Sequence, residues 1–258
     1  MLLAVNNLPR RDFLVIIGSL AGVTILSWVY LVLMACDMGS GGSFCMANMR
    51  IHSWSVGYFW AMFCMWAIMM VGMMVPSAAP MILIYAAVAR KAQDQGTPIA
   101  SSAIFTAGYV FMWTLFSRAV TLVQWQLDRA ALISPMMVSN SPKFGAALLI
   151  GAGIYQWLPA KNSCLEHCRS PFHFISSHWK QGKMGAWRMG VSHGAFCIGC
   201  CWALMLLLFV GGVMNILWIS AITLFVLLEK VLPLGKFGGR ISGILMVFMG
   251  SAILVLKQ

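Results

Sequence analysis

Long runs without charge are the feature that most restricts how this chain can fold. A helix needs about 20 apolar residues to cross the hydrocarbon of a bilayer. Seven stretches approach that length, and they are residues 13–35, 56–75 with a continuation to 89, 99–125, 144–158, 186–210, 213–228 and 241–256. Only 9% of the 258 residues are charged and 61% are hydrophobic, a composition that fits a bilayer rather than water. The sequence therefore predicts an all-α, polytopic transmembrane helix bundle that forms a single domain over residues 1–258.

The lysines and arginines lie between these runs and predict the orientation of the chain. Loops that face the cytoplasm carry the excess of these residues. With seven spans and a cytoplasmic N-terminus, twelve of the 17 lie inside and four outside, while Arg118 falls within the third span. Six spans and one short re-entrant segment are the alternative. Orientation and attraction to anionic lipid account for the net charge of +11, so the predicted partner is a lipid bilayer and not a nucleic acid.

The second stretch combines prolines with an unusual number of methionines. Pro76 and Pro80 each remove a backbone donor and clash with the preceding turn, which predicts a kinked or broken helix. The methionines are Met62, Met65, Met69, Met70, Met73 and Met74. Thioethers are soft ligands that suit Cu(I), but methionine is also an ordinary packing residue of apolar helices. The sequence is compatible with two roles for these methionines, a stripe that passes copper ions and simple packing.

Cysteines and histidines gather in two short segments. In the fifth stretch, one histidine and three cysteines fall at offsets of 0, 4, 7 and 8, within about a 100° arc of one helix face. The preceding loop adds two cysteines and a histidine, next to Glu166. Thiolate and imidazole bind Cu(I) and Zn(II), whereas a lone cysteine or histidine is often only a packing residue. The candidate metal ligands are Cys164, His167, Cys168, His193, Cys197, Cys200 and Cys201.

Two further features are candidates for function. Cys36 and Cys45 flank a predicted outer loop, where an oxidising compartment favours a disulfide; a metal-capture loop is the alternative. Arg118 and Glu229 are costly at membrane depth, which makes each a functional candidate unless its side chain reaches an interface. The chain has no Walker loop and no dinucleotide-binding glycine fingerprint, so coupling to a nucleotide is not expected.

Three motifs of this chain resemble a known family. They are residues 154–171 (IYQWLPAKNSCLEHCRSP), 188–205 (RMGVSHGAFCIGCCWALM) and 73–81 (MMVPSAAPM). Together they are similar to a bacterial family of predicted metal-binding integral membrane proteins, catalogued as a domain of unknown function, over residues 54–256. The resemblance implies a multi-pass protein of the bacterial inner membrane, in which the seven candidate ligands are the matching motif positions. It implies no reaction.

Three functions remain compatible with these observations. The leading hypothesis is a membrane protein that holds or delivers a transition metal through the cysteine and histidine cluster, with a donor or acceptor protein or other membrane subunits as partners. Copper is preferred over zinc because thioethers accompany the thiols. The second is a metal-dependent oxidoreductase, or a subunit of one, with a substrate cavity beside the cluster. The third is thiol-disulfide exchange with the outer pair Cys36 and Cys45, which leaves the two histidines without a role.

Overall fold

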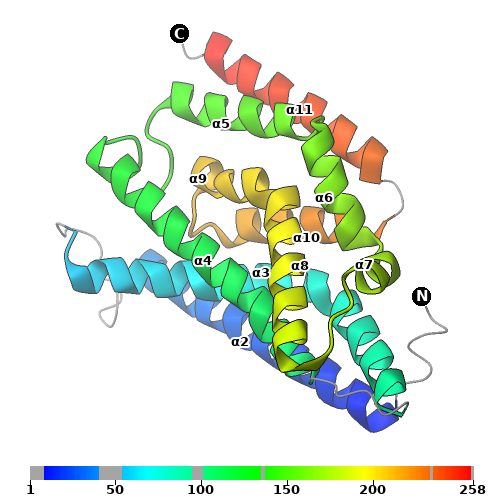
Figure 1. Ribbon diagram of the computed structural model, residues 1–258. Helices are drawn as coiled ribbons and strands as arrows, with labels where there is room; N and C mark the ends of the chain where they lie inside the picture. The colour runs from blue at the N-terminus through cyan, green and yellow to red at the C-terminus, as the bar shows by residue number, and fades with distance from the viewer. Residues whose placement is uncertain (1–8, 41–53, 95–100, 135–136, 233–234, 257–258) are drawn as a thin grey trace.

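The computed structural model describes residues 9–40, 54–94, 101–134, 137–232 and 235–256, and within these ranges every regular element is a helix (Figure 1). In chain order the helices are α2 (Arg10–Ser40), α3 (Val56–Asp94), α4 (Ser102–Arg129), α5 (Pro142–Tyr155), α6 (Pro159–Arg169), α7 (Pro171–His178), α8 (Gly182–Leu206), α9 (Leu208–Gly211), α10 (Ile216–Val231) and α11 (Gly235–Leu256). The all-α prediction is confirmed for the described residues.

Five helical segments are long and apolar enough to cross a membrane: Arg10–Cys36, Val56–Gln93, Ser102–Arg129, Gly182–Gly211 and Gly238–Leu256. The other two predicted spans correspond to α5 and α10, which have 14 and 16 residues. At 1.5 Å per residue they reach about 21 and 24 Å, short of the roughly 30 Å hydrocarbon layer. Seven spans and a cytoplasmic N-terminus therefore stay predictions.

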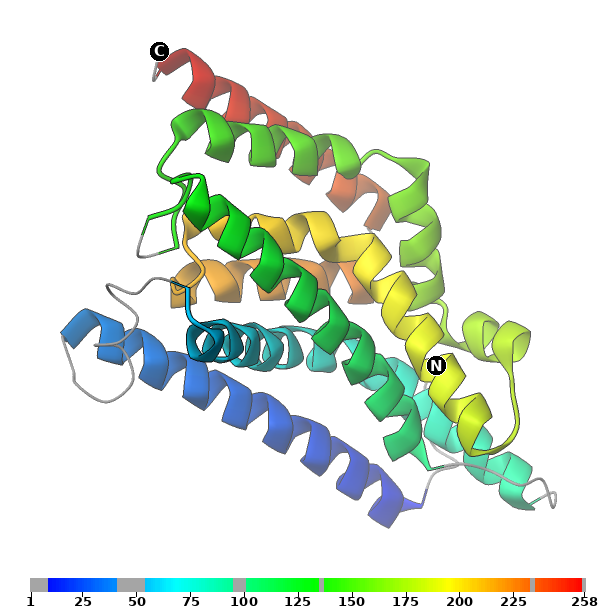
Figure 2. The same cartoon turned by 60° about the vertical axis from the view of Figure 1, so that its left-hand side comes forward.

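The helix α3 is continuous through both of its prolines, so the predicted break does not occur. Its ribbon instead changes direction part-way along, in the views of both Figure 1 and Figure 2. A proline inside a helix removes one backbone hydrogen bond and pushes the preceding turn aside, which bends the axis. Pro76 and Pro80 supply that cause here, and they lie directly after the methionine-rich part of the helix.

The core of the bundle forms where α4 crosses α8, with α3 packed on α4 and α6 packed on α8. Glycines allow the crossing: a Cβ on Gly108 would lie 2.5 Å from the carbonyl oxygen of Trp187. The facing Gly190 has no room for a Cβ either, because it would collide with the carbonyl oxygen of Phe105. The small residues let the two backbones approach closely, and this brings the side chains of α4 against the cysteine-bearing face of α8.

The segment with Cys164 and Cys168 was expected to be a loop, but it is the helix α6. Pro159 occupies the first helical turn, a position where its fixed φ and missing N–H suit a helix start. The cysteines are therefore one helical turn apart on a rigid element. Cys45 lies outside the described residues, so its predicted disulfide with Cys36 stays a prediction.

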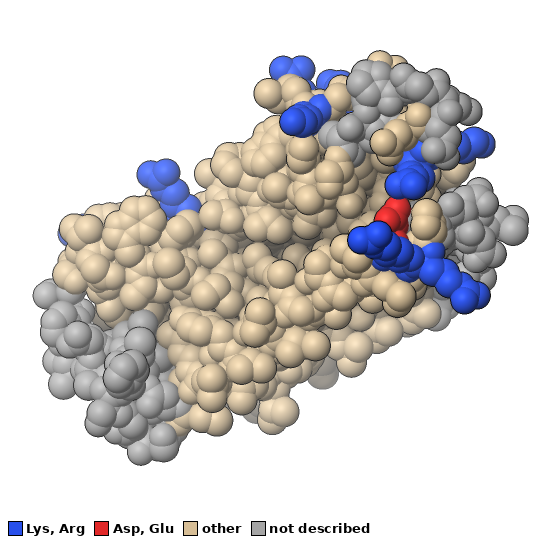
Figure 3. Space-filling view, turned by 90° about the horizontal axis from the view of Figure 1, so that it is seen from below, with Lys and Arg blue, Asp and Glu red and all other residues tan. Residues whose placement is uncertain are grey.

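The surface separates apolar and charged parts. The helices α2 and α11 expose large apolar side chains such as Leu26, Leu33 and Phe248, as lipid-facing helices do. Seen from below, basic side chains surround an acidic one at one edge, and most of that face carries no charge (Figure 3). Asp12 and Arg90 form an ion pair of 3.2 Å between α2 and α3, at the end where α3 finishes.

Candidate metal site

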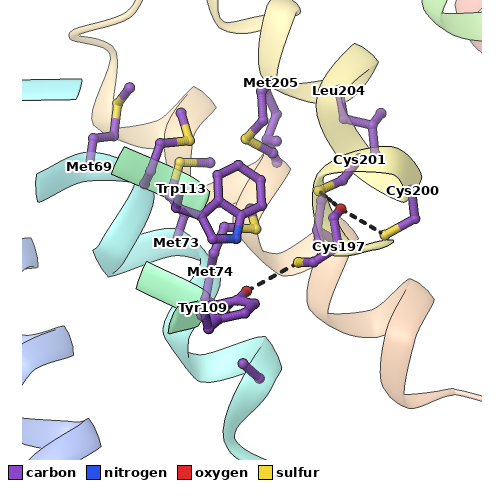
Figure 4. Close-up of a cluster of buried hydrophobic side chains, with 14 of the residues drawn as sticks. Met69, Met73, Met74, Tyr109, Trp113, Cys197, Cys200, Cys201, Leu204 and Met205 are labelled. Carbon is purple, nitrogen blue, oxygen red and sulfur yellow. Dashed lines mark hydrogen bonds between the residues drawn. The ribbon is translucent and has the colours of Figure 1, made fainter. Parts of the chain in front are cut away.

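Three cysteine thiols lie on the buried face of α8, beside α4 (Figure 4). Cys197, Cys200 and Cys201 are each at most 2% exposed. The thiols of Cys200 and Cys201 donate hydrogen bonds of 3.1 and 2.9 Å to the carbonyl oxygen of Cys197, back along their own helix. The i, i+3 and i+4 spacing of one helix face puts them together, as the sequence pattern indicated.

The helix α6 adds a fourth thiol to this group. Cys168 is partly buried and lies close to Cys197 and Cys200, and its interaction with these two thiols, followed by burial, raises the pKa of its own thiol well above the usual value. Cys164, one turn earlier, lies against Gly199, where a Cβ would be 2.7 Å from its Sγ. Burial, followed by the nearby Cys200, raises the pKa of the Cys164 thiol. We call Cys168, Cys197, Cys200 and Cys201 the thiol cluster.

Two polar groups from other helices contact Cys197. The Lys230 ammonium of α10 donates hydrogen bonds of 2.9 Å both to Cys197 Sγ and to Ser77 Oγ of α3. The Tyr109 hydroxyl of α4 lies 3.1 Å from Cys197 Sγ and also donates to the Met74 carbonyl oxygen at 3.1 Å. A buried cation beside a sulfur atom favours negative charge on that sulfur, so the cluster is built to accept thiolate.

The two predicted histidine ligands both stack on aromatic rings. His193 is 2% exposed and stacks on Phe105 and Tyr109, and its Nδ1 has no hydrogen-bond partner among the described residues. His167 of α6 stacks on Phe196 with ring centroids 4.2 Å apart, and its Nδ1 lies 2.8 Å from the Ser163 carbonyl oxygen. A buried imidazole nitrogen without a partner is unusual and suits a ligand position.

These side chains are close together, but they are not set around a common point. No group of three or more His, Cys, Asp or Glu side chains in the described part of the chain has the arrangement that holds a metal ion. The hydrogen bonds explain this, because two thiols point to a backbone carbonyl and the Cys197 sulfur faces an ammonium group. Thiols and imidazole are the right donors for Cu(I), but metal binding would require these side chains to leave their present hydrogen bonds.

Glu229 and Arg118, the two charged residues expected to be costly at membrane depth, lie in different surroundings. Glu229 pairs with Lys161 of α6 at 2.5 Å, with both side chains at most 4% exposed, and Gln156 also accepts a hydrogen bond from the same ammonium. This pair fastens α10 to α6 next to the thiol cluster. Arg118 is exposed and lines a groove of about 450 Å³ with Trp60 and Phe111, away from the cluster.

Sequence reasoning missed Lys230 and Tyr109. Lys230 follows Glu229 directly at the end of an otherwise uncharged helix, and this adjacent pair was the available signal. Only Glu229 had been singled out, whereas it is Lys230 that contacts a thiol. Tyr109 carried no signal in the sequence, because the contact of its hydroxyl with Cys197 depends on the crossing of α4 and α8.

Comparisons with known proteins identify one relationship. Residues 63–253 match the model of the PpoB2 family, which is described as a copper chaperone. The matched region includes the methionine-rich part of α3, the thiol cluster and Lys230. No curated protein and no solved structure matches the chain.

Proposed function

This chain belongs to the PpoB2 family of copper chaperones, and we propose from that premise that it holds Cu(I) on the thiol cluster inside a membrane helix bundle and delivers it to an acceptor protein. The sequence motifs indicated a family of metal-binding membrane proteins, and the family match shows that the family is related to copper. The bacterial inner membrane, the seven-span topology and the ligand set are parts of the proposal.

One observation carries the proposal: four thiols from α6 and α8 meet in the interior beside a buried ammonium group. Two thiolates and one Cu(I) carry a net charge of −1, which is costly in an apolar interior unless it is compensated. Lys230 lies 2.9 Å from Cys197 Sγ and supplies the compensating charge. His193 lies one helical turn before Cys197 on the same helix. Its unpartnered Nδ1 makes it the candidate neutral ligand.

Delivery needs a route by which an acceptor reaches the ion. Cys164, His167 and Cys168 lie on α6, a short helix outside the five long apolar segments, and all three are only partly buried. Copper passes between proteins when an incoming thiolate replaces one ligand at a time, so a partly exposed cysteine next to buried ones suits this exchange. In the N-in orientation α6 faces the cytoplasm, and we place release there.

Elemental analysis of the detergent-purified protein, loaded with Cu(I) under reducing conditions, tests the proposal. Wild-type protein retains near-stoichiometric copper, and a variant with Cys168, Cys197 and Cys200 changed to serine loses it. Cys64 is exposed on α3, so Cys64→Ala is the matched control and keeps the copper. Equal copper in all three proteins would rule out the thiol cluster as the site.

Thiol-disulfide exchange is favoured by the same proximity, because Cys168 of α6 lies close to Cys197 and Cys200 of α8. Counting free thiols before and after a mild oxidant separates the two functions. Metal-free protein that cycles between thiol and disulfide, and that binds no copper in either state, would replace copper binding by redox exchange.

A further inference from the structure

The methionines of α3 lie in the interior of the bundle, in line with one another. Met65, Met69 and Met73 recur every four residues and are each at most 1% exposed. Successive sulfur atoms on such a face are about 6 Å apart along the helix axis. A row of thioether sulfur atoms thus runs through the interior of the bundle toward the thiol cluster.

A matching row runs along α8. His193, Cys197, Cys201 and Met205 also recur every four residues, and each is buried. The face of α8 that carries the thiols therefore continues, one turn further, into a thioether. Soft ligand atoms occupy the same stripe for three helical turns.

Two contacts set the register between the rows. At one end, the Tyr109 hydroxyl bridges the Met74 carbonyl oxygen and Cys197 Sγ, at 3.1 Å from each. At the other end, the rings of Trp66 and Phe209 are 5.5 Å apart. Residue numbers thus fall along α3 as they rise along α8 and α9, so the two rows run in opposite directions. Figure 4 shows Met69 and Met73 on one side of the Trp113 ring and the three α8 thiols on the other.

We propose that the row of Met65, Met69 and Met73 on α3 forms a thioether Cu(I) site adjoining the thiol cluster, in which an ion lies between two neighbouring sulfur atoms of the row. This inference rests on the proposed function, since it supplies the stage of binding before the thiols. Thioethers are neutral, so copper keeps its single positive charge there and binds more weakly than to thiolates. The face of the buried Trp113 ring also attracts a cation. No proton is displaced and the ion stays Cu(I).

The end of the row away from the thiols carries buried polar side chains. Gln124 of α4, 2% exposed, accepts a hydrogen bond of 2.6 Å from the Trp66 indole, and its amide nitrogen lies 3.5 Å from Met62 Sδ. Buried Ser117 and Thr121 lie along the same helix. A cation that enters here meets an amide oxygen first and thioethers next, which is a sequence of increasing softness.

Selenomethionine labelling distinguishes this site from the thiol cluster, because X-ray absorption at the copper edge separates Cu–Se from Cu–S scattering. We use labelled protein in which Cys168, Cys197, Cys200 and Cys201 are all serine, loaded with Cu(I). A Cu–Se distance typical of thioether ligation is expected. It should disappear when Met65, Met69 and Met73 are also leucine, a nearly volume-conserving change, and persist when exposed Met184 and Met249 are leucine instead.

The outcomes separate the two proposals. If the wild type binds copper but the labelled variant without the thiol cluster shows no selenium scattering, the thioether site is overturned and the thiol cluster stands. Selenium scattering that survives the triple leucine variant also overturns it, because other methionines then hold the ion. Wild-type protein without copper overturns both proposals. The thermal unfolding midpoint of the triple variant checks that the bundle remains folded.

Discussion

Replacing Lys230 by methionine is the most direct test of how the thiol cluster stabilises copper. Methionine has nearly the length of lysine and no charge, so Lys230→Met removes the ammonium 2.9 Å from Cys197 Sγ with little change in packing. With Lys230, a Cu(I) bis-thiolate and the ammonium sum to zero charge. Without it, copper binding leaves a net charge of −1 in the interior. We expect the variant to bind Cu(I) more weakly.

The size of the effect follows from the distance. Two unit charges about 4 Å apart interact by about 4 kcal/mol at an effective dielectric constant of about 20, which sets an upper limit near a factor of about 1,000 in affinity. Local relaxation and water reduce this, and groups that support metal ligands typically contribute about 10- to 100-fold. A loss of about 10- to 100-fold is expected for Lys230→Met.

Competition with a chromophoric Cu(I) chelator, under reducing conditions in detergent, measures this affinity. Lys183 is exposed at the start of α8, so Lys183→Met is the matched control and should bind like the wild type. Affinity that is unchanged or higher in Lys230→Met, and also in Lys230→Leu, which introduces no thioether ligand, would refute the reasoning, because the ammonium would then be a competitor of copper for Cys197 rather than its counter-charge.

Two more predictions concern the scaffold around the cluster. Lys161→Met leaves Glu229 buried without its partner and should reduce the free energy of unfolding by about 3 kcal/mol, and adding Glu229→Gln should recover most of this loss in thermal melts. If Lys161→Met loses no free energy of unfolding, the ion pair is solvated and the reasoning is wrong. Gly190→Ala places a Cβ against the Phe105 carbonyl oxygen, so α4 and α8 should separate and both the melting temperature and the copper affinity should fall. Gly151→Ala, with open space around its Cβ position, should melt at or above the wild-type temperature; equal behaviour of the two glycine variants would contradict the close crossing.

The metal preference inferred from ligand chemistry agrees with the family to which the chain belongs. Thioethers beside thiols favoured copper over zinc, and the matched family is described as a copper chaperone. The choice could be made from residue types because softness is a property of the ligand atom, and it does not depend on where the atom lies.

The sequence by itself determined the helical class, most of the long apolar segments and the group of thiols on α8. These depend on local periodicity, since the offsets of Cys197, Cys200 and Cys201 place them on one face in any α-helix. The sequence did not reveal that α6 is helical, because its 11 residues are mostly polar and too few to show a sustained helical period.

Only the tertiary structure decided what surrounds those thiols. The contact of Lys230 with Cys197 joins residues 33 positions apart, and that of Tyr109 with Cys197 joins residues 88 positions apart. Contacts over such separations depend on how helices cross, which here rests on the space left by Gly108 and Gly190. A periodic pattern predicts which residues share one helix face, but the partner helix, and with it the charge beside the sulfur, is chosen by packing.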